Sequence, residues 1–194
     1  LAINVSELYR NPEKWLEVEN KILPSLITGA RALKIWSAGC SIGAEAHTLA
    51  MILDSRFPGS HRVIGTDIDQ AALAQAKEGW YTDSDMRCAP EKLRDKYFLK
   101  LDGKWRAKPE LKKYLTFRTE NLLESKCETG FDMILCRNVV IYFTEPAKEA
   151  LYRRFFDALK PGGVLFVGST ERIFNSREIG FETTIPFFYQ KPST

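Results

Sequence analysis

Short apolar runs along the chain alternate with stretches in which apolar residues recur every three or four positions. The apolar runs, at 33–36, 63–64, 131–136 and 164–168, are typical of buried strands. Between the first two runs, apolar residues follow the spacing of one helix face, at Ala46, Leu49, Ala50 and Leu53. Further helices are predicted over residues 71–77 and 146–159, and a further strand over 115–119. Strands that alternate with helices predict an α/β fold with a parallel sheet.

Small residues join the first predicted strand to the first predicted helix, with glycines at Gly39 and Gly43. Strand, glycine-bearing turn and helix form the first unit of a nucleotide-binding α/β fold. Glycines let a ligand approach the backbone, and the helix N-terminus offers unpaired N–H groups. Because the Gly39-x-x-x-Gly43 spacing differs from the dinucleotide pattern GxGxxG, the turn alone also fits a tight connection without a ligand.

The second predicted strand ends in acidic residues. Asp67 lies 24 residues beyond Gly43, close to where a parallel α/β fold places a ribose-binding carboxylate. A carboxylate can accept hydrogen bonds from two vicinal hydroxyls. The alternative is that Asp67 only closes a loop, whereas Asp69 is expected to cap the following helix.

Arg137 and Asn138 directly follow the apolar run 131–136. Polar side chains at the carboxyl end of a buried strand lie where ligands bind in open α/β sheets. They are therefore predicted to face a ligand, with the alternative that Asn138 only satisfies nearby backbone groups.

The two ends of the chain show further local signals. Asn11, Pro12 and Glu13 predict a helix start with Asn11 as its N-cap. The helix is expected to end or kink at Pro24 and to bury a stripe of Trp15, Val18, Ile22 and Leu26. Two closely spaced strands, 181–185 and 187–190, predict an antiparallel hairpin at one edge of the sheet. Because the chain begins at Leu1, it is expected to be part of a longer protein.

Residues 78–118 interrupt the alternation of strands and helices, and this insertion is longer than usual connections. It carries 11 Lys and Arg against 7 Asp and Glu, so the basic surplus of the chain lies here. Residues 97–101 and 104–106 predict a hairpin around an Asp102-Gly103 turn. The charge fits either a solvated face or a docking surface for an acidic partner, and composition does not choose between them.

Composition narrows the class of protein. A chain of 194 residues is expected to form one domain, and its net charge of +3 does not indicate a nucleic-acid binder. Four cysteines show no metal-binding spacing, and Cys40 and Cys136 are predicted to be reduced core thiols of a cytoplasmic protein. No signal peptide and no apolar run of membrane-spanning length is found.

Four segments together resemble the chemotaxis receptor glutamate methyltransferase (CheR-type) family: LKIWSAGCSIGAEAHTLAM, IGTDID, ILCRNVVIYF and LKPGGVLFVGSTE. The resemblance covers residues 4–190. It implies an S-adenosylmethionine (SAM)-dependent enzyme that esterifies glutamates on cytoplasmic helices of chemoreceptors, with S-adenosylhomocysteine as product. It also implies the Rossmann-like seven-stranded class I methyltransferase sheet, order 3-2-1-4-5-7-6. Residues 1–30 would form a lead-in and helix, and residues 31–194 the catalytic domain, with a receptor-docking β-subdomain inserted at about 96–118.

The resemblance also implies a set of site residues. Cofactor contacts would fall on Asn4, Ser6, Arg10, Ala38, Glu45, Asp67, Asn121, Leu122, Arg137 and Asn138, and the catalytic residues would be Arg10 and Tyr142. Glu45 would pair with the cofactor ammonium, Arg10 would hold a carboxylate, and Asn121 would bind adenine. Alternatively, Glu45 would be a solvated acid on the helix surface and Arg10 a surface cation. Asn121 would be a turn residue, and Tyr142 would be a core aromatic.

One motif departs from the family. Where the family usually reads GEEPY, this chain has Gly43-Ala44-Glu45-Ala46-His47, which keeps the second acid but not the first acid, the proline or the tyrosine. His47 is therefore predicted to be a packing or surface substitute and not a catalyst.

A glutamate acceptor is already ionised at pH 7, so methyl transfer to it needs no general base. This agrees with a sequence without a catalytic triad or metal cluster. Two alternatives stay open: a nicotinamide-dependent oxidoreductase, and a non-catalytic SAM-binding regulator or scaffold. A small-molecule or nucleic-acid methyltransferase is disfavoured because no Asn-Pro-Pro-Tyr-like site and no strong basic field is present. We expect a monomer that binds neither nucleic acid, membrane nor metal.

Overall fold

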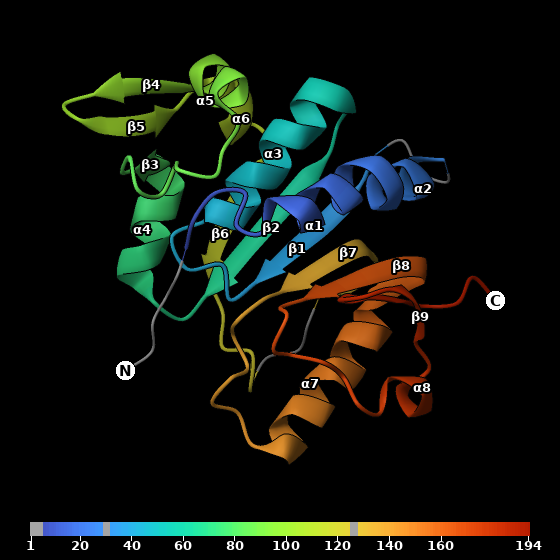
Figure 1. Ribbon diagram of the computed structural model, residues 1–194. Coiled ribbons are helices and arrows are strands. Elements are labelled where there is room, and N and C mark those ends of the chain that lie inside the picture. Colours follow the sequence, from blue (N-terminus) through green and yellow to red (C-terminus); the bar gives the residue numbers. More distant parts are fainter. Residues whose placement is uncertain (1–5, 29–31, 125–127) are drawn as a thin grey trace.

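A seven-stranded sheet forms the centre of the computed structural model, which describes residues 6–28, 32–124 and 128–194 (Figure 1). Its strand order is β6-β2-β1-β7-β8-β10-β9. The first five strands are parallel, and β10 runs antiparallel to both β8 and β9. The bounds are β1 Lys34–Ala38, β2 Arg62–Asp67, β6 Leu115–Thr119, β7 Phe131–Cys136, β8 Leu159–Val167, β9 Glu182–Ile185 and β10 Phe188–Gln190. Numbered within this sheet alone, the order is 3-2-1-4-5-7-6, which confirms the predicted topology and the C-terminal hairpin.

Helices cover both faces of this sheet. The α-helices of the described residues are α1 Pro12–Glu17, α2 Leu23–Ile27, α3 Ala44–Arg56, α4 Gln70–Glu78, α5 Glu91–Tyr97, α6 Pro109–Lys112, α7 Glu145–Ala158 and α8 Ser176–Ile179, of which α5 lies in the insertion. Figure 1 shows α3 and α7 on opposite sides of the strands. The central strands β1 and β7 are buried on both faces, which is why they appear in the sequence as nearly continuous apolar runs. Ile35 belongs to the core shared with α3, and its neighbour Trp36 to the core shared with α7.

The N-terminal helix differs from its prediction in two respects. Asn11 is not a side-chain cap, because its φ of 61° is left-handed and its side chain accepts instead from Arg137. Of the two outcomes predicted for Pro24, an end of the helix is wrong, because the chain stays helical to Ile27 after a π-helical turn, Val18–Ile22, and a kink stays a prediction. The predicted stripe is confirmed, since its members are buried: Trp15, Val18, Ile22 and Leu26.

The insertion folds into a small antiparallel sheet of order β3-β5-β4 at the upper left of Figure 1. Its strands are β3 Trp80–Tyr81, β4 Phe98–Leu101 and β5 Lys104–Ala107. The hairpin prediction is confirmed, with positive φ at both Asp102 and Gly103, as a type I′ turn requires. The two-residue strand β3 is too short to show a pattern in the sequence. The division of the chain into 1–30 and 31–194 stays a prediction.

None of the helices within the described ranges has the length and apolar character needed to cross a membrane.

Candidate active site

A cavity of about 310 Å³ opens where β1, β2 and β7 end. Its walls come from the turn after β1, the start of α3, the end of β2, the segment after β7 and the N-terminal segment. The lining residues are Ser6, Glu7, Arg10, Gly39, Cys40, Ser41, Ala44, Glu45, Asp67, Ile68, Asp69, Arg137, Asn138 and Val139. The structure thus brings together Ser6, Arg10, Glu45, Asp67, Arg137 and Asn138 from the predicted set.

The turn after β1 depends on a glycine that packs tightly. Gly39 has a left-handed φ of +70°, and a Cβ there would lie 2.7 Å from Cγ2 of Val139. A side chain at position 39 would therefore be strained and would push against the segment that follows β7. This close approach fixes two walls of the cavity relative to each other.

Asp67 is held by two backbone donors at the end of β2. One carboxylate oxygen accepts from the N–H of Ser41 at 2.7 Å, and the other accepts from the N–H of Asp69 at 2.9 Å. A carboxylate has about four acceptor positions, so both oxygens keep capacity for a ligand. Asp67 therefore fastens the turn after β1 and also lines the cavity. Asp69 accepts from Ala72 N–H at 3.1 Å, which confirms its predicted role as the cap of α4.

Glu45 and Arg137 form an ion pair in the wall of the cavity, with 3.2 Å between Oε2 and Nη1. The side chains of Arg137 and Glu45 are only 4% and 19% exposed. Burial raises the pKa of Glu45 above its ordinary value, although the charge of Arg137 acts to lower it. The alternative of a solvated acid on the helix surface is therefore wrong for Glu45.

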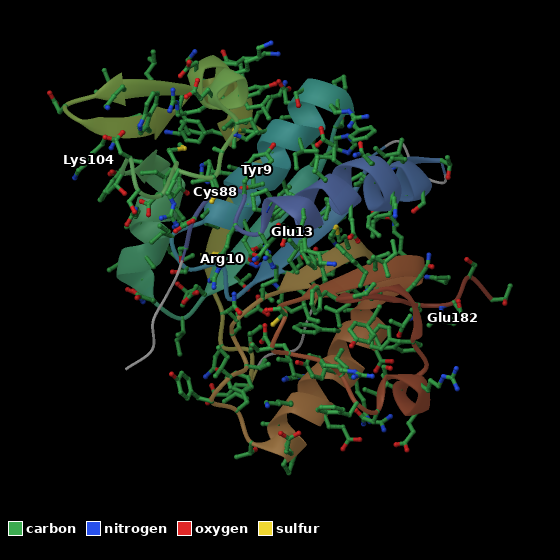
Figure 2. The ribbon with its side chains drawn as sticks, in the orientation of Figure 1. Tyr9, Arg10, Glu13, Cys88, Lys104 and Glu182 are labelled. Atoms are coloured by element: carbon green, nitrogen blue, oxygen red, sulfur yellow. The ribbon has the colours of Figure 1, made fainter. Side chains whose placement is uncertain are left out.

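The N-terminal segment is fastened across the cavity from two sides. The N–H of Tyr9 donates to the hydroxyl of Thr48 on α3 at 3.0 Å. On the other side, the carboxylate of Glu7 accepts from the thiol of Cys88 in the insertion at 3.3 Å. Figure 2 labels Tyr9 and Arg10 of the N-terminal segment and Cys88 of the adjoining insertion. Arg10, predicted as a cofactor contact and a catalytic residue, is thereby brought into the lining of the cavity.

Comparison with known proteins decides the family. Residues 4–185 match the family described as "CheR methyltransferase, SAM binding domain". The chain belongs to this family. It is 38% identical over 193 residues to "Chemotaxis protein methyltransferase" of Listeria innocua, which covers 98% of this chain and 74% of the relative. It is 34% identical over 187 residues to "Chemotaxis protein methyltransferase 1" of Pseudomonas aeruginosa, covering 90% and 68%.

A solved structure shows the same fold as this CheR-family domain. The TehB-like SAM-dependent methyltransferase from Corynebacterium glutamicum superposes with a TM-score of 0.51 at 18% identity, covering 93% of both chains. At this identity the likeness concerns the fold alone. Together with the family match, it establishes the class I methyltransferase architecture that the sequence predicted.

Four predicted site residues do not line the cavity of the CheR-family domain. Ala38 is fully buried at the end of β1, and Leu122 is 8% exposed after β6. Asn121 accepts from the N–H of Leu123 at 2.9 Å, as in the turn role given as its alternative. Tyr142 is 72% exposed, so the alternative of a core aromatic is wrong. The cofactor and catalytic roles of these residues stay predictions, and Asn4 lies outside the described residues.

Two acids of this region were not predicted. Glu7 lines the cavity from the N-terminal segment. Glu171, 5% exposed, lies in the loop after β8 and accepts hydrogen bonds from the segment after β7. The only sequence signal for Glu171 is an acid shortly after a buried strand. Its backbone partners in the segment after β7 lie more than 30 positions away in the sequence, and no motif marks them.

Proposed function

We propose that this CheR-family domain transfers a methyl group from SAM to glutamate side chains on the cytoplasmic helices of a chemoreceptor. The observation that carries the proposal is the meeting of Glu45, Asp67, Arg137 and Asn138 in one cavity at the carboxyl ends of parallel strands. This is the position at which open α/β sheets bind their ligands.

The residues of the cavity suit the chemistry of SAM. Asp67 keeps acceptor capacity on both oxygens for the ribose hydroxyls. Glu45 offers a negative charge for the cofactor ammonium, and Nε of Arg137 is buried without a hydrogen-bond partner among the described residues. The volume of about 310 Å³ falls at the lower end of the range for small-molecule sites.

When bound, the cofactor supplies a methyl group on a positively charged sulfur. A glutamate oxygen would take up this methyl group as an ester, and the cofactor would be left as a neutral thioether that keeps the electron pair of the C–S bond. Because the acceptor carboxylate is ionised at pH 7, no side chain needs to remove a proton. Holding the two reactants in line can supply about 7–11 kcal/mol of the barrier.

Arg10 and Tyr142 are the residues we assign to the acceptor. Arg10 lines the cavity, and its guanidinium can hold a carboxylate through two parallel hydrogen bonds. Tyr142 is exposed in the segment that continues from Asn138, so its ring is available to a protein substrate. In this assignment Arg10 orients the acceptor carboxylate and Tyr142 helps to exclude water from the transferred methyl.

The small sheet is the surface we assign to receptor docking. Its edge strand β4 carries Leu99 and Leu101, each 53% exposed. Lys104, labelled in Figure 2, lies over the ring of Trp80, with 3.9 Å from Nζ to the ring centroid. The edge strand β4 with its apolar side chains, next to Lys104 at the start of β5, suits an extended acidic segment of the receptor outside the helices that carry the acceptor glutamates.

The proposal is tested with tritiated SAM and a purified cytoplasmic receptor fragment. We expect label in the fragment that alkali releases as methanol, because carboxyl esters are base-labile and methylated amines are not. Calorimetry should show S-adenosylhomocysteine binding that Asp67→Ala weakens strongly. Thr144→Ala, which removes the N-cap of α7, is the control and should bind normally.

Other results separate the alternatives. Binding of S-adenosylhomocysteine without any methyl transfer to receptor fragments would favour the non-catalytic regulator. A thermal shift with NADH and none with S-adenosylhomocysteine would contradict the proposal. Unchanged affinity in Asp67→Ala would contradict the ribose role of Asp67.

A further inference from the structure

The buried carboxylate of Glu171 joins the loop after β8 to the segment after β7. Its Oε1 accepts from the N–H groups of Asn138 and, at 3.2 Å, Gly168. Its Oε2 accepts from Val139 and Val140 at 3.2 and 3.1 Å. One carboxylate thus satisfies four backbone donors, three of them consecutive in the chain.

Three consecutive N–H groups that point at one place form a concave site for an anion. Such donors repel one another unless a negative charge lies among them. Asn138 has a φ of 60°, a left-handed conformation that a residue with a side chain rarely adopts. The Glu171 carboxylate supplies the negative charge from within the protein, so it supports this backbone conformation directly.

The segment that Glu171 holds is part of the candidate active site. Asn138 and Val139 line the cofactor cavity. A turn follows at once, in which the N–H of Phe143 donates to the carbonyl of Val140 at 3.0 Å, and this turn carries Tyr142. Glu171 itself lines a second cavity, of about 370 Å³, beside α7.

We propose that Glu171 is a positioning residue for methyl transfer, which rests on the function proposed above. Its carboxylate fixes residues 138–140 so that Asn138 faces the cofactor and Tyr142 stays at the rim of the cavity. It touches neither reactant, and it acts through the backbone that it binds.

Gly168 gives a second way to disturb the same contact. A Cβ at position 168 would lie 2.6 Å from Oε1 of Glu171 and 2.9 Å from Oδ1 of Asn138. Gly168→Ala would therefore push the Glu171 carboxylate away from the segment after β7, although the acid itself is kept.

The test compares Glu171→Gln and Gly168→Ala with a matched control, Asp132→Asn. Asp132 is also a buried acid, 6% exposed, and accepts from the N–H of Lys34 at 2.8 Å, but it lies at the opposite end of β7. Each variant is measured for unfolding by urea, for S-adenosylhomocysteine affinity by calorimetry, and for amide hydrogen exchange at residues 138–140 by NMR.

We expect Glu171→Gln and Gly168→Ala to weaken S-adenosylhomocysteine binding by about tenfold or more. Both should also speed amide exchange at residues 138–140. In Glu171→Gln the side-chain NH₂ group would face the backbone N–H groups of these residues, and in Gly168→Ala the new methyl group would displace the carboxylate that accepts from them. Asp132→Asn is expected to lose stability without a change in affinity or in exchange at these amides.

Affinity and exchange equal to wild type in both loop variants would overturn the proposal. An equal loss of affinity in Asp132→Asn would overturn it too, because the effect would then follow general destabilisation. If the wild type failed to bind S-adenosylhomocysteine, the proposed function would fail, while exchange at residues 138–140 would still decide whether Glu171 holds them. If Glu171→Gln does not fold, the affinity and the amide exchange of Gly168→Ala decide whether Glu171 is a positioning residue.

Discussion

The guanidinium of Arg137 and the carboxylate of Glu45 lie 3.2 Å apart in the wall of the cavity, although 92 positions separate them in the chain. Arg137 also donates to the carbonyl of Arg10 at 3.2 Å and to Oδ1 of Asn11 at 2.7 Å. Its guanidinium carbon lies 4.6 Å from the ring centroid of Phe166. One side chain therefore connects the end of β7, α3 and the N-terminal segment. These three parts of the chain carry Asn138, Glu45 and Arg10 respectively, which line the same cavity.

Arg137→Met should cost about 3–5 kcal/mol of the free energy of unfolding, because it leaves the buried Glu45 without its partner. Arg153→Met is the control, since Arg153 pairs with Glu149 at 3.2 Å on the exposed face of α7. That exposed pair is worth about 1 kcal/mol or less. Urea unfolding of both variants checks the difference, and equal losses would contradict a structural role for the buried pair.

Gly39→Ala should be more destabilising than Gly103→Ala, although both glycines have left-handed φ, +70° and +76°. The conformational penalty of about 1–2 kcal/mol is common to both. Only at Gly39 does the new Cβ meet a neighbour, Val139, whereas nothing lies within 4 Å at Gly103. Overpacking should add about 1–3 kcal/mol at Gly39 and weaken S-adenosylhomocysteine binding. Urea unfolding and calorimetry measure these effects, and equal results for the two variants would exclude the Val139 contact as their cause.

The sheet and the position of the cavity were predictable because they follow from local patterns. The apolar runs fixed the parallel strands, and Asp67, Arg137 and Asn138 come directly after strands whose carboxyl ends meet at one edge. The Asp102-Gly103 turn was equally local, since its residues are those that adopt positive φ.

Contacts between distant segments were not predictable in this way. Asn11 has the residue type of an N-cap, yet its side chain is taken by Arg137 from 126 positions away. Glu171 binds backbone N–H groups, which every residue except proline carries, so no partner residue could mark it in the sequence. For Asn11, a contact with a distant residue overrode the local preference for an N-cap. For Glu171, the sequence contains no pattern from which its role could be predicted.

Asp54 of α3 fastens the insertion by accepting from the hydroxyls of Tyr97 at 2.8 Å and Tyr114 at 2.5 Å. Tyr97→Phe and Tyr114→Phe should each cost about 1.5–3 kcal/mol, as expected for a hydrogen bond to a charged group. Tyr142→Phe, at an exposed position, is the control for stability and should stay within about 0.5 kcal/mol of wild type. Urea unfolding checks all three, and near-neutral Tyr97 and Tyr114 variants would contradict the anchoring role.

The same contact predicts a loss of stability in acid. Burial acts to raise the pKa of Asp54, but hydrogen bonds from Tyr114 and Tyr97 and the charge of Lys113 together lower it. The folded carboxylate therefore stays charged at a pH where the unfolded one, with a pKa of about 3.9, takes up a proton. Its contribution is complete above that pH and is lost as pH falls toward the folded pKa. Unfolding of Asp54→Asn followed below pH 5 should show a shallower acid slope than wild type.

His47 should make the domain less stable between about pH 6.5 and pH 4, because burial lowers its pKa to about 4. Its ring is fully buried, with Nδ1 2.8 Å from the hydroxyl of Tyr81 and the ring stacked on Phe117, which confirms it as a packing residue. The unfolded histidine takes up a proton as pH falls below about 6.5, while the folded one stays neutral until about pH 4. Proton binding therefore lowers the free energy of the unfolded state relative to the folded state over this window, by up to about 3 kcal/mol.

His47→Phe keeps the stacking on Phe117 and removes the titrating group. Its free energy of unfolding should therefore fall less steeply than that of wild type from pH 6.5 to pH 4.5, as measured by urea unfolding in matched buffers. Glu45 contributes a slope of opposite sign, since burial raises its pKa and its folded form takes up a proton first. Because Glu45 is present in both proteins, the difference between the two slopes isolates His47. Identical slopes would mean that the imidazole is accessible to protons in the folded state.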